Sequence, residues 1–516
     1  MKKFLSGLSK IIFSRALIMI LIVLLQFLVL VWGGYALASK SDYLYYAMYL
    51  CGALVVTAIV NTDEPAEFKL TWAVITIVLP MVGILLYAFN KSNWGMISLK
   101  HKVDEELLVS KHLIRISDGT KDALLTQDAD FRRFSGYMDE KCGYPTYHNT
   151  KVTYYPIGEE NIEAIKEELK KAERFIFIEY FIIAEGQVWN GILDILKEKV
   201  KEGVEVRVMY DGLCSLFKLP IHYAKKLCDM GINAKLFAPV IPFFSTTQNN
   251  RDHRKIVVID GKVAFTGGVN MADEYANLKV LFGHWKDIGV KIEGRAVMSM
   301  TRLFIQNWNL YGEIEKDYEK YLDEELVEHK PEQDGYVIPY GDTPTTKYEI
   351  GKTVYEDIIT HANEYIHIMT PYFIVDREFL STVKYAAFKG LDVKIIIPHI
   401  PDKKIPYYVG RTFYPELLEA GVEVYEYAPG FVHAKSVVAD GKMAALGSVN
   451  LDYRSFYHHF ECGVYLYKNS SIYDMEKDFE ETLSKCIRVT PDYYRKEIPL
   501  RQKLIGQSFK IFAPLL

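Results

Sequence analysis

The sequence has few cysteines and little excess of either charge, and both features narrow the class of protein. Its six cysteines lie at 51, 142, 214, 228, 462 and 486 of 516 residues, and none form a C-x-x-C pair. Such a scatter excludes a disulfide scaffold and a cysteine-based zinc module. The 61 Lys and Arg against 66 Asp and Glu leave a net charge of −5. That balance argues against a surface built to bind nucleic acid.

Two sequence motifs are also missing. The chain has no H-E-x-x-H metalloprotease motif and no G-x-x-x-x-G-K-[ST] phosphate loop. His458 and His459 are adjacent rather than at the spacing of metal ligands. The sequence therefore predicts no metal, no cofactor and no nucleotide hydrolysis.

Charged residues are absent from three long stretches near the N-terminus. No charge lies between Arg15 and Lys40, between Asp42 and Asp63, or between Lys69 and Lys91. A helix needs roughly 20 apolar residues to cross a bilayer, so we expect a membrane anchor over 1–92. Its predicted transmembrane helices are 16–37, 43–61 and 70–90. Three such stretches disfavour a cleaved signal peptide.

The anchor predicts a multi-pass protein of the cell membrane. The positive charges that flank the three stretches are divided almost equally between the two sides of the membrane. They therefore do not decide which side bears the rest of the chain.

The rest of the chain has an α/β pattern that occurs twice. After a linker over 93–145, helical and strand-like stretches alternate over 146–335, and the same order recurs over 336–490. We expect two similar domains, each a mixed and mostly parallel sheet flanked by helices, packed as a pseudo-dimer.

Each half contains one polar constellation. His253, Lys255 and Asp260 precede Gly267-Gly268-Val269-Asn270, and His433, Lys435 and Asp440 precede Gly447-Ser448-Val449-Asn450, with an offset of 180 residues throughout. The histidine and lysine of each pair share one face of a strand. One copy of H-x-K-x4-D is a weak signal, but two equally spaced copies are hard to explain as a polar strand face.

These residue types suit chemistry at phosphorus. A lysine offers positive charge and donors to a phosphoryl oxygen. A histidine can attack phosphorus or act as a general acid or base. Two such pairs at one interface would let one histidine attack while the other protonates the leaving alcohol. Asn270, Asn450, Gly268 and Ser448 are predicted to hold the remaining phosphate oxygens.

The duplicated motif resembles that of the phospholipase D superfamily. Asn250–Gly261, Gly267–Tyr275, Gly430–Lys435 and Gly447–Phe456 are similar to segments of bacterial cardiolipin synthases within it. The resemblance covers about 45–516. One difference is His459, where that family commonly has Asn.

The resemblance implies a phosphatidyltransferase with His253, Lys255, Asp260, His433, Lys435 and Asp440 as catalytic residues. Two phosphatidylglycerol molecules would give cardiolipin and glycerol through a phosphatidyl-histidine. The alternatives are a phospholipase D hydrolase, a transferase that uses serine or ethanolamine, a nuclease of the superfamily, and a non-catalytic membrane scaffold. The expected partners are phospholipids and the membrane, without nucleic acid; the oligomeric state stays open.

Two carboxylates are predicted to orient the histidines. Asp287 follows His253 by 34 positions and Glu461 follows His433 by 28, so each carboxylate is expected to serve the histidine of its own half. A carboxylate on one ring nitrogen fixes the tautomer and frees the other nitrogen. The tail, 491–516, mixes basic and apolar residues, which is typical of an interfacial anchor or of a helix docked on the protein itself.

Overall fold

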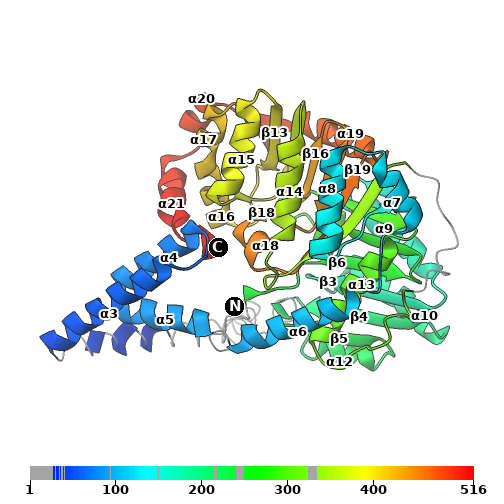
Figure 1. Ribbon diagram of the computed structural model, residues 1–516, viewed down its shortest axis with the longest axis horizontal. Coiled ribbons are helices and arrows are strands. Elements are labelled where there is room, and N and C mark those ends of the chain that lie inside the picture. The colour runs from blue at the N-terminus through cyan, green and yellow to red at the C-terminus, as the bar shows by residue number, and fades with distance from the viewer. Residues whose placement is uncertain are drawn as a thin grey trace, which may run out of the picture.

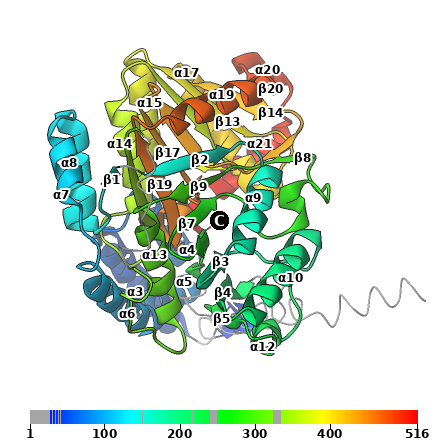
Figure 2. The same ribbon diagram turned by 90° about the vertical axis from the view of Figure 1, so that its right-hand side faces the viewer.

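Two sheets dominate the computed structural model, which describes residues 27–29, 31–33, 35–36, 39, 41–92, 94–148, 150–213, 218–239, 249–322 and 334–515. The first sheet lies in the green half of the chain and the second in the yellow-to-red half (Figure 2). Helices cover both sheets, and an N-terminal group of helices extends away from this body (Figure 1).

The first sheet has the order β2-β9-β7-β6-β3-β4-β5. Its strands are β2 (Lys151–Tyr155), β3 (Phe175–Tyr180), β4 (Glu205–Asp211), β5 (Asn233–Phe237), β6 (Lys255–Ile259), β7 (Val263–Gly267) and β9 (Gly289–Glu293). Strands β3, β6 and β7 are almost wholly buried, as their apolar sequences predict.

The second sheet has the order β1-β10-β19-β17-β16-β11-β13-β14-β20. Its strands are β1 (Tyr147–His148), β10 (Tyr336–Asp342), β11 (Tyr365–Met369), β13 (Asp392–Pro398), β14 (Glu423–Tyr427), β16 (Ser436–Ala439), β17 (Met443–Gly447), β19 (Glu461–Tyr467) and β20 (Cys486–Val489). Without the edge strands β1 and β20, its order matches that of the first sheet strand for strand.

The shared strand order accounts for the repeated sequence pattern. In both sheets only the β3-β4-β5 strands and their counterparts β11-β13-β14 pair in parallel, and the remaining neighbours are antiparallel. The α/β class with mixed sheets is therefore confirmed, but the expected predominance of parallel pairs is wrong. The hairpins β6–β7 and β16–β17 supply antiparallel neighbours. His253 precedes β6, and His433 and Lys435 precede β16, so the expectation that each histidine and lysine share one face of a strand is wrong.

Helices connect the strands of each half, and one of them, α13 (Val297–Leu310), lies between the two sheets. In the first half they are α9 (Gly158–Lys170), α10 (Gln187–Lys201), α12 (Tyr223–Cys228) and α13. In the second they are α14 (Ile350–His361), α15 (Arg377–Phe388), α16 (Lys404–Gly410), α17 (Tyr414–Glu419), α18 (Tyr453–Tyr457) and α19 (Ser471–Leu483). Every residue of α13 is buried, and its neighbours include β3 and β6 of one sheet and β10 of the other.

The segment predicted as a linker is largely helical. It forms α6 (Trp94–Ser110), α7 (Asp118–Leu125), α8 (Ala129–Tyr137) and a π-helical turn, η1 (Met138–Cys142). Phe131 stacks on Tyr467 with ring centroids 3.7 Å apart, and α6 contacts α13. The segment therefore belongs to the folded body.

The N-terminal helices differ from the three predicted spans. Helix α3 (Asp42–Val60) corresponds to 43–61, and it is the one helix among the described residues that is long and apolar enough to cross a membrane. The predicted span 16–37 lies mostly outside the described residues.

The prediction of one spanning helix over 70–90 is wrong. That segment forms α4 (Ala66–Val78) and α5 (Pro80–Ser92), which contact each other and α3. Leu79 leaves the helical conformation with φ −132° and ψ 74°, because proline disfavours a helical residue before it. Gly83 allows the two helices to meet closely, since a Cβ there would overlap the backbone of Thr76.

The C-terminal tail lies against the second half and the N-terminal helices. It forms α20 (Pro491–Lys496), α21 (Leu500–Lys510) and η6 (Ala513–Leu515). Helix α21 packs on α16, and η6 contacts α4 and α18. The hydroxyl of Thr71 donates a hydrogen bond to the carbonyl of Ile511 at 2.6 Å. Leu500 and Leu504 stay 69% and 59% exposed, so the tail is docked on the protein and still presents apolar side chains outward.

Candidate active site

The two motif histidines lie where strands of one half pair with strands of the other. Strand β8 (His284–Lys286) of the first half pairs in parallel with β15 (Gly430–Val432) of the second, and Val432 is opposite Lys286. One step further along this register brings His433 opposite Asp287. The His433 Nδ1 lies 2.7 Å from an oxygen of Asp287.

The same relationship holds for the other histidine. Asp252 and Phe460 form an isolated parallel bridge between the halves, and the next pair along is His253 and Glu461. The His253 Nδ1 lies 3.0 Å from both carboxylate oxygens of Glu461. The expected pairing of each carboxylate with the histidine of its own half is therefore wrong. The pairs cross because tertiary strand pairing places them, not distance along the chain.

Each motif lysine turns back toward its histidine. Lys255 Nζ donates to the backbone carbonyl of His253, and Lys435 Nζ donates to that of His433. Both lysines are at most 1% exposed. Their ammonium groups offer donors and positive charge to an anionic ligand beside the two imidazoles.

Burial sets the protonation of this cluster. It lowers the pKa of His433 to about 4 and that of His253 well below its ordinary value, although the neighbouring carboxylates oppose the change. Burial likewise lowers the pKa of Lys255 to about 8 and of Lys435 to about 7. Burial alone would raise the pKa of Glu461, but His253 and His459 together outweigh it and hold that pKa below its ordinary value. Burial therefore favours the neutral form of His253 and His433.

Gly268 and Ser448 occupy equivalent positions beside the two carboxylates. A Cβ on Gly268 would overlap the Asp287 carboxylate and lie 3.0 Å from the carbonyl of His433. The Ser448 hydroxyl donates to Glu461 and accepts from the Cys462 N–H at 2.9 Å. The structure thus gives both positions a role in placing a carboxylate, whereas the sequence predicts contact with phosphate.

The two asparagines differ in their hydrogen bonds. Asn270 Oδ1 accepts from the N–H of Ile182 at 3.1 Å. The Oδ1 of Asn450 is buried and has no hydrogen-bond partner among the described residues. An unpaired buried amide oxygen costs free energy. Because Oδ1 is an acceptor, Asn450 suits a hydroxyl donor on a ligand rather than an ionised phosphate oxygen.

The motif aspartates are far from the histidines. Asp260 follows the last residue of β6 and Asp440 follows that of β16, with left-handed φ values of 55° and 54°. Each histidine precedes the first residue of its strand, so the extended chain separates histidine and aspartate by about 20 Å. Each carboxylate accepts three backbone N–H groups, from Glu173, Arg174 and Phe175 in one half and from Asn363, Glu364 and Tyr365 in the other. The structure therefore does not bring these aspartates into the site; they hold the chain that enters β3 and β11.

His459 is a third histidine in the site, and the sequence analysis noted it only as a departure from the usual Asn. Its ring lies 5.3 Å from that of His253, and its Nδ1 lies 3.5 Å from Glu461. His253, His459 and Glu461 present ligand atoms within 4.8 Å of one another, as do His367, Glu476 and Glu480 elsewhere among the described residues. Both groups could hold a metal ion, so the metal-free site stays a prediction.

Comparison with known proteins identifies the family. Residues 165–308 and 355–483 match the family described as cardiolipin synthase, PLD-like domain. The chain belongs to that family. The resemblance inferred from the motifs is thereby confirmed.

Individual relatives match over nearly the whole chain. A cardiolipin synthase of a Geobacillus species is 34% identical over 94% of this chain and 95% of its own. A cardiolipin synthase of Alkalihalophilus pseudofirmus is 35% identical over 87% and 88%. An uncharacterized protein of Streptococcus mutans is 46% identical over 89% and 99%. The solved phosphatidylserine synthase of Haemophilus influenzae shares the fold, with a TM-score of 0.55, 15% identity and coverage of 71% and 95%.

Proposed function

We propose that this protein is a cardiolipin synthase that transfers a phosphatidyl group between two phosphatidylglycerol molecules and releases glycerol. The observation that carries the proposal is the pair of crossed His–carboxylate contacts between the halves, which supports one buried site made by both His-Lys pairs. The halves would act as a pseudo-dimer with a single site. Relatives named cardiolipin synthase over most of the chain support the choice of reaction.

The first half-reaction forms a phosphatidyl-histidine. Glu461 accepts a hydrogen bond from Nδ1–H of His253, so the lone pair on Nε2 is free to attack phosphorus. The P–O bond to glycerol breaks, and the glycerol oxygen takes a proton from His433. Lys255 and Lys435 stabilise the charge on the phosphoryl oxygens. A bound phosphodiester anion favours the protonated forms of the lysines and of His433.

The second half-reaction returns the histidines to their starting states. Neutral His433 takes the proton from the primary hydroxyl of a second phosphatidylglycerol, and that oxygen attacks phosphorus. The P–N bond to His253 breaks, and cardiolipin leaves. One phosphodiester replaces another, so no nucleotide is consumed. The His253 and His433 side chains are nearly buried, which limits competing attack by water.

We also propose that the protein is anchored in the cell membrane by more than one pass. Helix α3 has the required length, and residues 16–37 have the required composition. The apolar side chains that α3, α4 and α5 expose, among them Leu54, Ile77 and Phe89, support contact with lipid. The exposed leucines of α21 would add an interfacial contact.

Product analysis tests the reaction. The purified full-length protein is incubated with phosphatidylglycerol alone, with and without a strong chelator. Cardiolipin and glycerol in equal amounts, unaffected by the chelator, support the proposal. Phosphatidic acid alone indicates a hydrolase, and no turnover indicates a scaffold. Loss of turnover in the chelator, restored by a divalent ion, would overturn the metal-free mechanism.

A further inference from the structure

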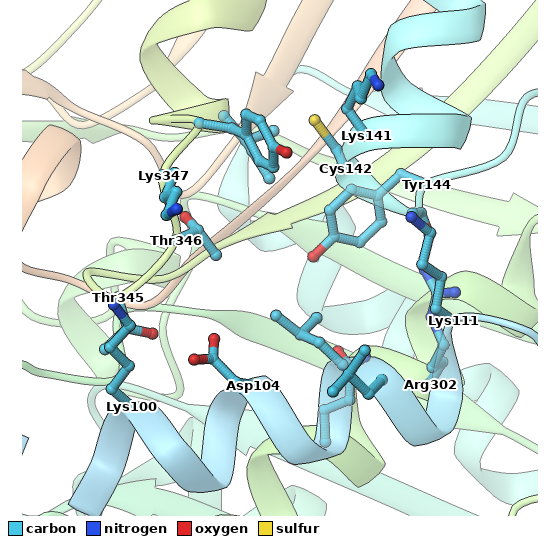
Figure 3. A pocket seen from close by; sticks show the side chains of 16 residues that line it. Lys100, Asp104, Lys111, Lys141, Cys142, Tyr144, Arg302, Thr345, Thr346 and Lys347 are labelled. Atoms are coloured by element: carbon cyan, nitrogen blue, oxygen red, sulfur yellow. The ribbon is translucent and has the colours of Figure 1, made fainter. Parts of the chain in front are cut away.

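A cavity away from the histidines has the chemistry of a lipid-phosphate site. It measures about 490 Å³ and lies between α6, the π-helical turn η1, α13 and the loop that precedes α14. Figure 3 shows Lys100 and Asp104 on α6, with Thr345, Thr346 and Lys347 on the loop opposite. No residue of either H-x-K-x4-D motif lines it. Its size is in the range of pockets that hold a small organic molecule.

Arg302 is the most unusual group in this cavity. It is 1% exposed, and among the described residues its Nε and Nη1 have no hydrogen-bond partner and no carboxylate lies within 4 Å of it. Nη2 donates to the carbonyl of Gly143 at 2.5 Å, and the guanidinium carbon lies 5.4 Å from the centre of the Tyr144 ring. A buried guanidinium with no carboxylate in contact is costly. An anion in the cavity would remove that cost through a charge-assisted contact.

The rest of the lining carries the same sign of charge. Lys100, Lys111, Lys141 and Lys347 line the cavity against one acidic residue, Asp104. Lys100, Lys141 and Lys347 form no ion pair with the described residues, and Lys111 donates to a backbone carbonyl. Five cations against one anion favour a negatively charged group.

Apolar side chains complete the cavity. Leu107, Leu108, Tyr144 and Ile350 line it beside the cations, and Leu108 is 70% exposed. Helix α6 leads directly from the apolar hairpin α4–α5 to the body (Figure 1). A free phosphate ion would leave this apolar wall unused, whereas a phospholipid would contact the cations with its phosphate and the wall with its glycerol and acyl chain.

We propose that this cavity binds one anionic phospholipid as a second, non-catalytic lipid site, with the lipid phosphate on Arg302 and the surrounding lysines. The site goes beyond the proposed reaction and does not depend on it, because a hydrolase or a scaffold with the same cavity would bind the same lipid.

Cys142 provides a local readout, because its free thiol lines the cavity. Burial raises its pKa to about 11 and that of Cys486, on the distant strand β20, to about 12. Cys486 is therefore a matched internal reference. The full-length protein carries His253→Asn and His433→Asn, so that it does not consume the lipid. It is alkylated in an uncharged detergent, and the modification of each cysteine is followed by peptide mass spectrometry.

Phosphatidylglycerol is expected to slow alkylation of Cys142 on the order of tenfold when the lipid is at about ten times its dissociation constant, with Cys486 unchanged. Adding Lys141→Glu and Lys347→Glu, both at exposed positions, should weaken the protection at least roughly tenfold. Adding Lys170→Glu and Lys389→Glu, which makes the same charge change on other faces, should leave it intact.

Four outcomes would overturn the proposal. These are no protection by phosphatidylglycerol, equal protection by zwitterionic phosphatidylcholine, protection by glycerol 3-phosphate alone, and equal loss in both charge-reversed proteins. The third would indicate a site for free phosphate esters, and the fourth a general surface attraction. Product formation by the unmodified protein is measured separately, so failure of the lipid site and failure of the proposed reaction are distinguishable.

Discussion

Glu461 of the second half holds His253 of the first, with the imidazole Nδ1 3.0 Å from both carboxylate oxygens. Asp287 of the first half holds His433 of the second through one carboxylate oxygen, 2.7 Å from Nδ1. Each half on its own therefore contains a histidine without its carboxylate. Both His–carboxylate pairs form only when β8 pairs with β15 and Asp252 pairs with Phe460.

The crossed pairs make a kinetic prediction. A p-nitrophenyl phosphodiester has a leaving group that needs no proton, so its first turnover reports attack by His253 alone. Glu461→Gln should slow this burst by about 10³- to 10⁴-fold, because the ring loses the partner that fixes its tautomer. Asp287→Asn should leave the burst within a few-fold and slow the subsequent steady state. Stopped-flow absorbance measures both phases, and the reverse pattern would restore the same-half pairing.

Gly268→Ala should abolish most activity without unfolding the protein. Its Cβ would overlap the Asp287 carboxylate, which must then move away from His433. We expect kcat to fall by at least about 10²-fold, on the scale of a misplaced catalytic group, with a small change in Tm. Gly136→Ala is the matched control, since no atom lies within 4 Å of a Cβ at that position. Equal activity in the two variants would remove the steric argument.

Asp260→Asn should act on stability rather than on chemistry. The variant weakens three hydrogen bonds to backbone N–H groups, and hydrogen bonds to charged groups are worth roughly 1.5–3 kcal/mol each before compensation by the amide oxygen. Asparagine tolerates the left-handed φ of 55° at this position. Denaturant unfolding should show a loss of stability, while kcat per folded molecule stays within a few-fold. A large fall in kcat at unchanged stability would place Asp260 in the catalytic machinery after all.

The pH profile of kcat/KM should fall on the alkaline side. Burial lowers the pKa of Lys435 to about 7 and of Lys255 to about 8. As the pH rises through 7 to 8, free enzyme loses the positive charge that attracts the phosphodiester anion. We expect log kcat/KM to fall above about pH 7, while kcat, which reports the substrate complex, holds to a higher pH. A kcat/KM that is flat from pH 6 to 9 would contradict this account of the lysines.

Local patterns predict local structure well in this chain. The hairpins that follow His253 and His433 form β6–β7 and β16–β17 because short apolar runs and the Asp-Gly turns act over a few residues. The duplicated motif also predicts the family. Features that depend on long-range pairing cannot be predicted in this way. The crossed carboxylates depend on the register of β8 on β15. The burial of Arg302 depends on the packing of α13 against α6.

Two other differences have physical causes within single segments. The stretch 70–90 is apolar enough to span a bilayer, but Pro80 breaks it into two helices, and composition alone does not register that break. Asp260 belongs to the motif and was therefore predicted to be catalytic, yet a five-residue strand separates it from His253. Sequence spacing shows that His253 and Asp260 belong to one motif, but the extended strand between them keeps their side chains far apart.

The covalent adduct tests the central claim, that His253 carries the phosphatidyl group while His433 of the other half moves the proton. A phosphatidyl ester of p-nitrophenol is mixed with His433→Asn and with His253→Asn, the reaction is quenched, and each protein is digested and analysed by mass spectrometry. The account predicts a phosphatidyl adduct on His253 in the His433→Asn protein and none in the His253→Asn protein. An adduct on His433 in the His253→Asn protein, with none in its counterpart, would reverse the two roles. Turnover with no adduct on either histidine would contradict the covalent mechanism.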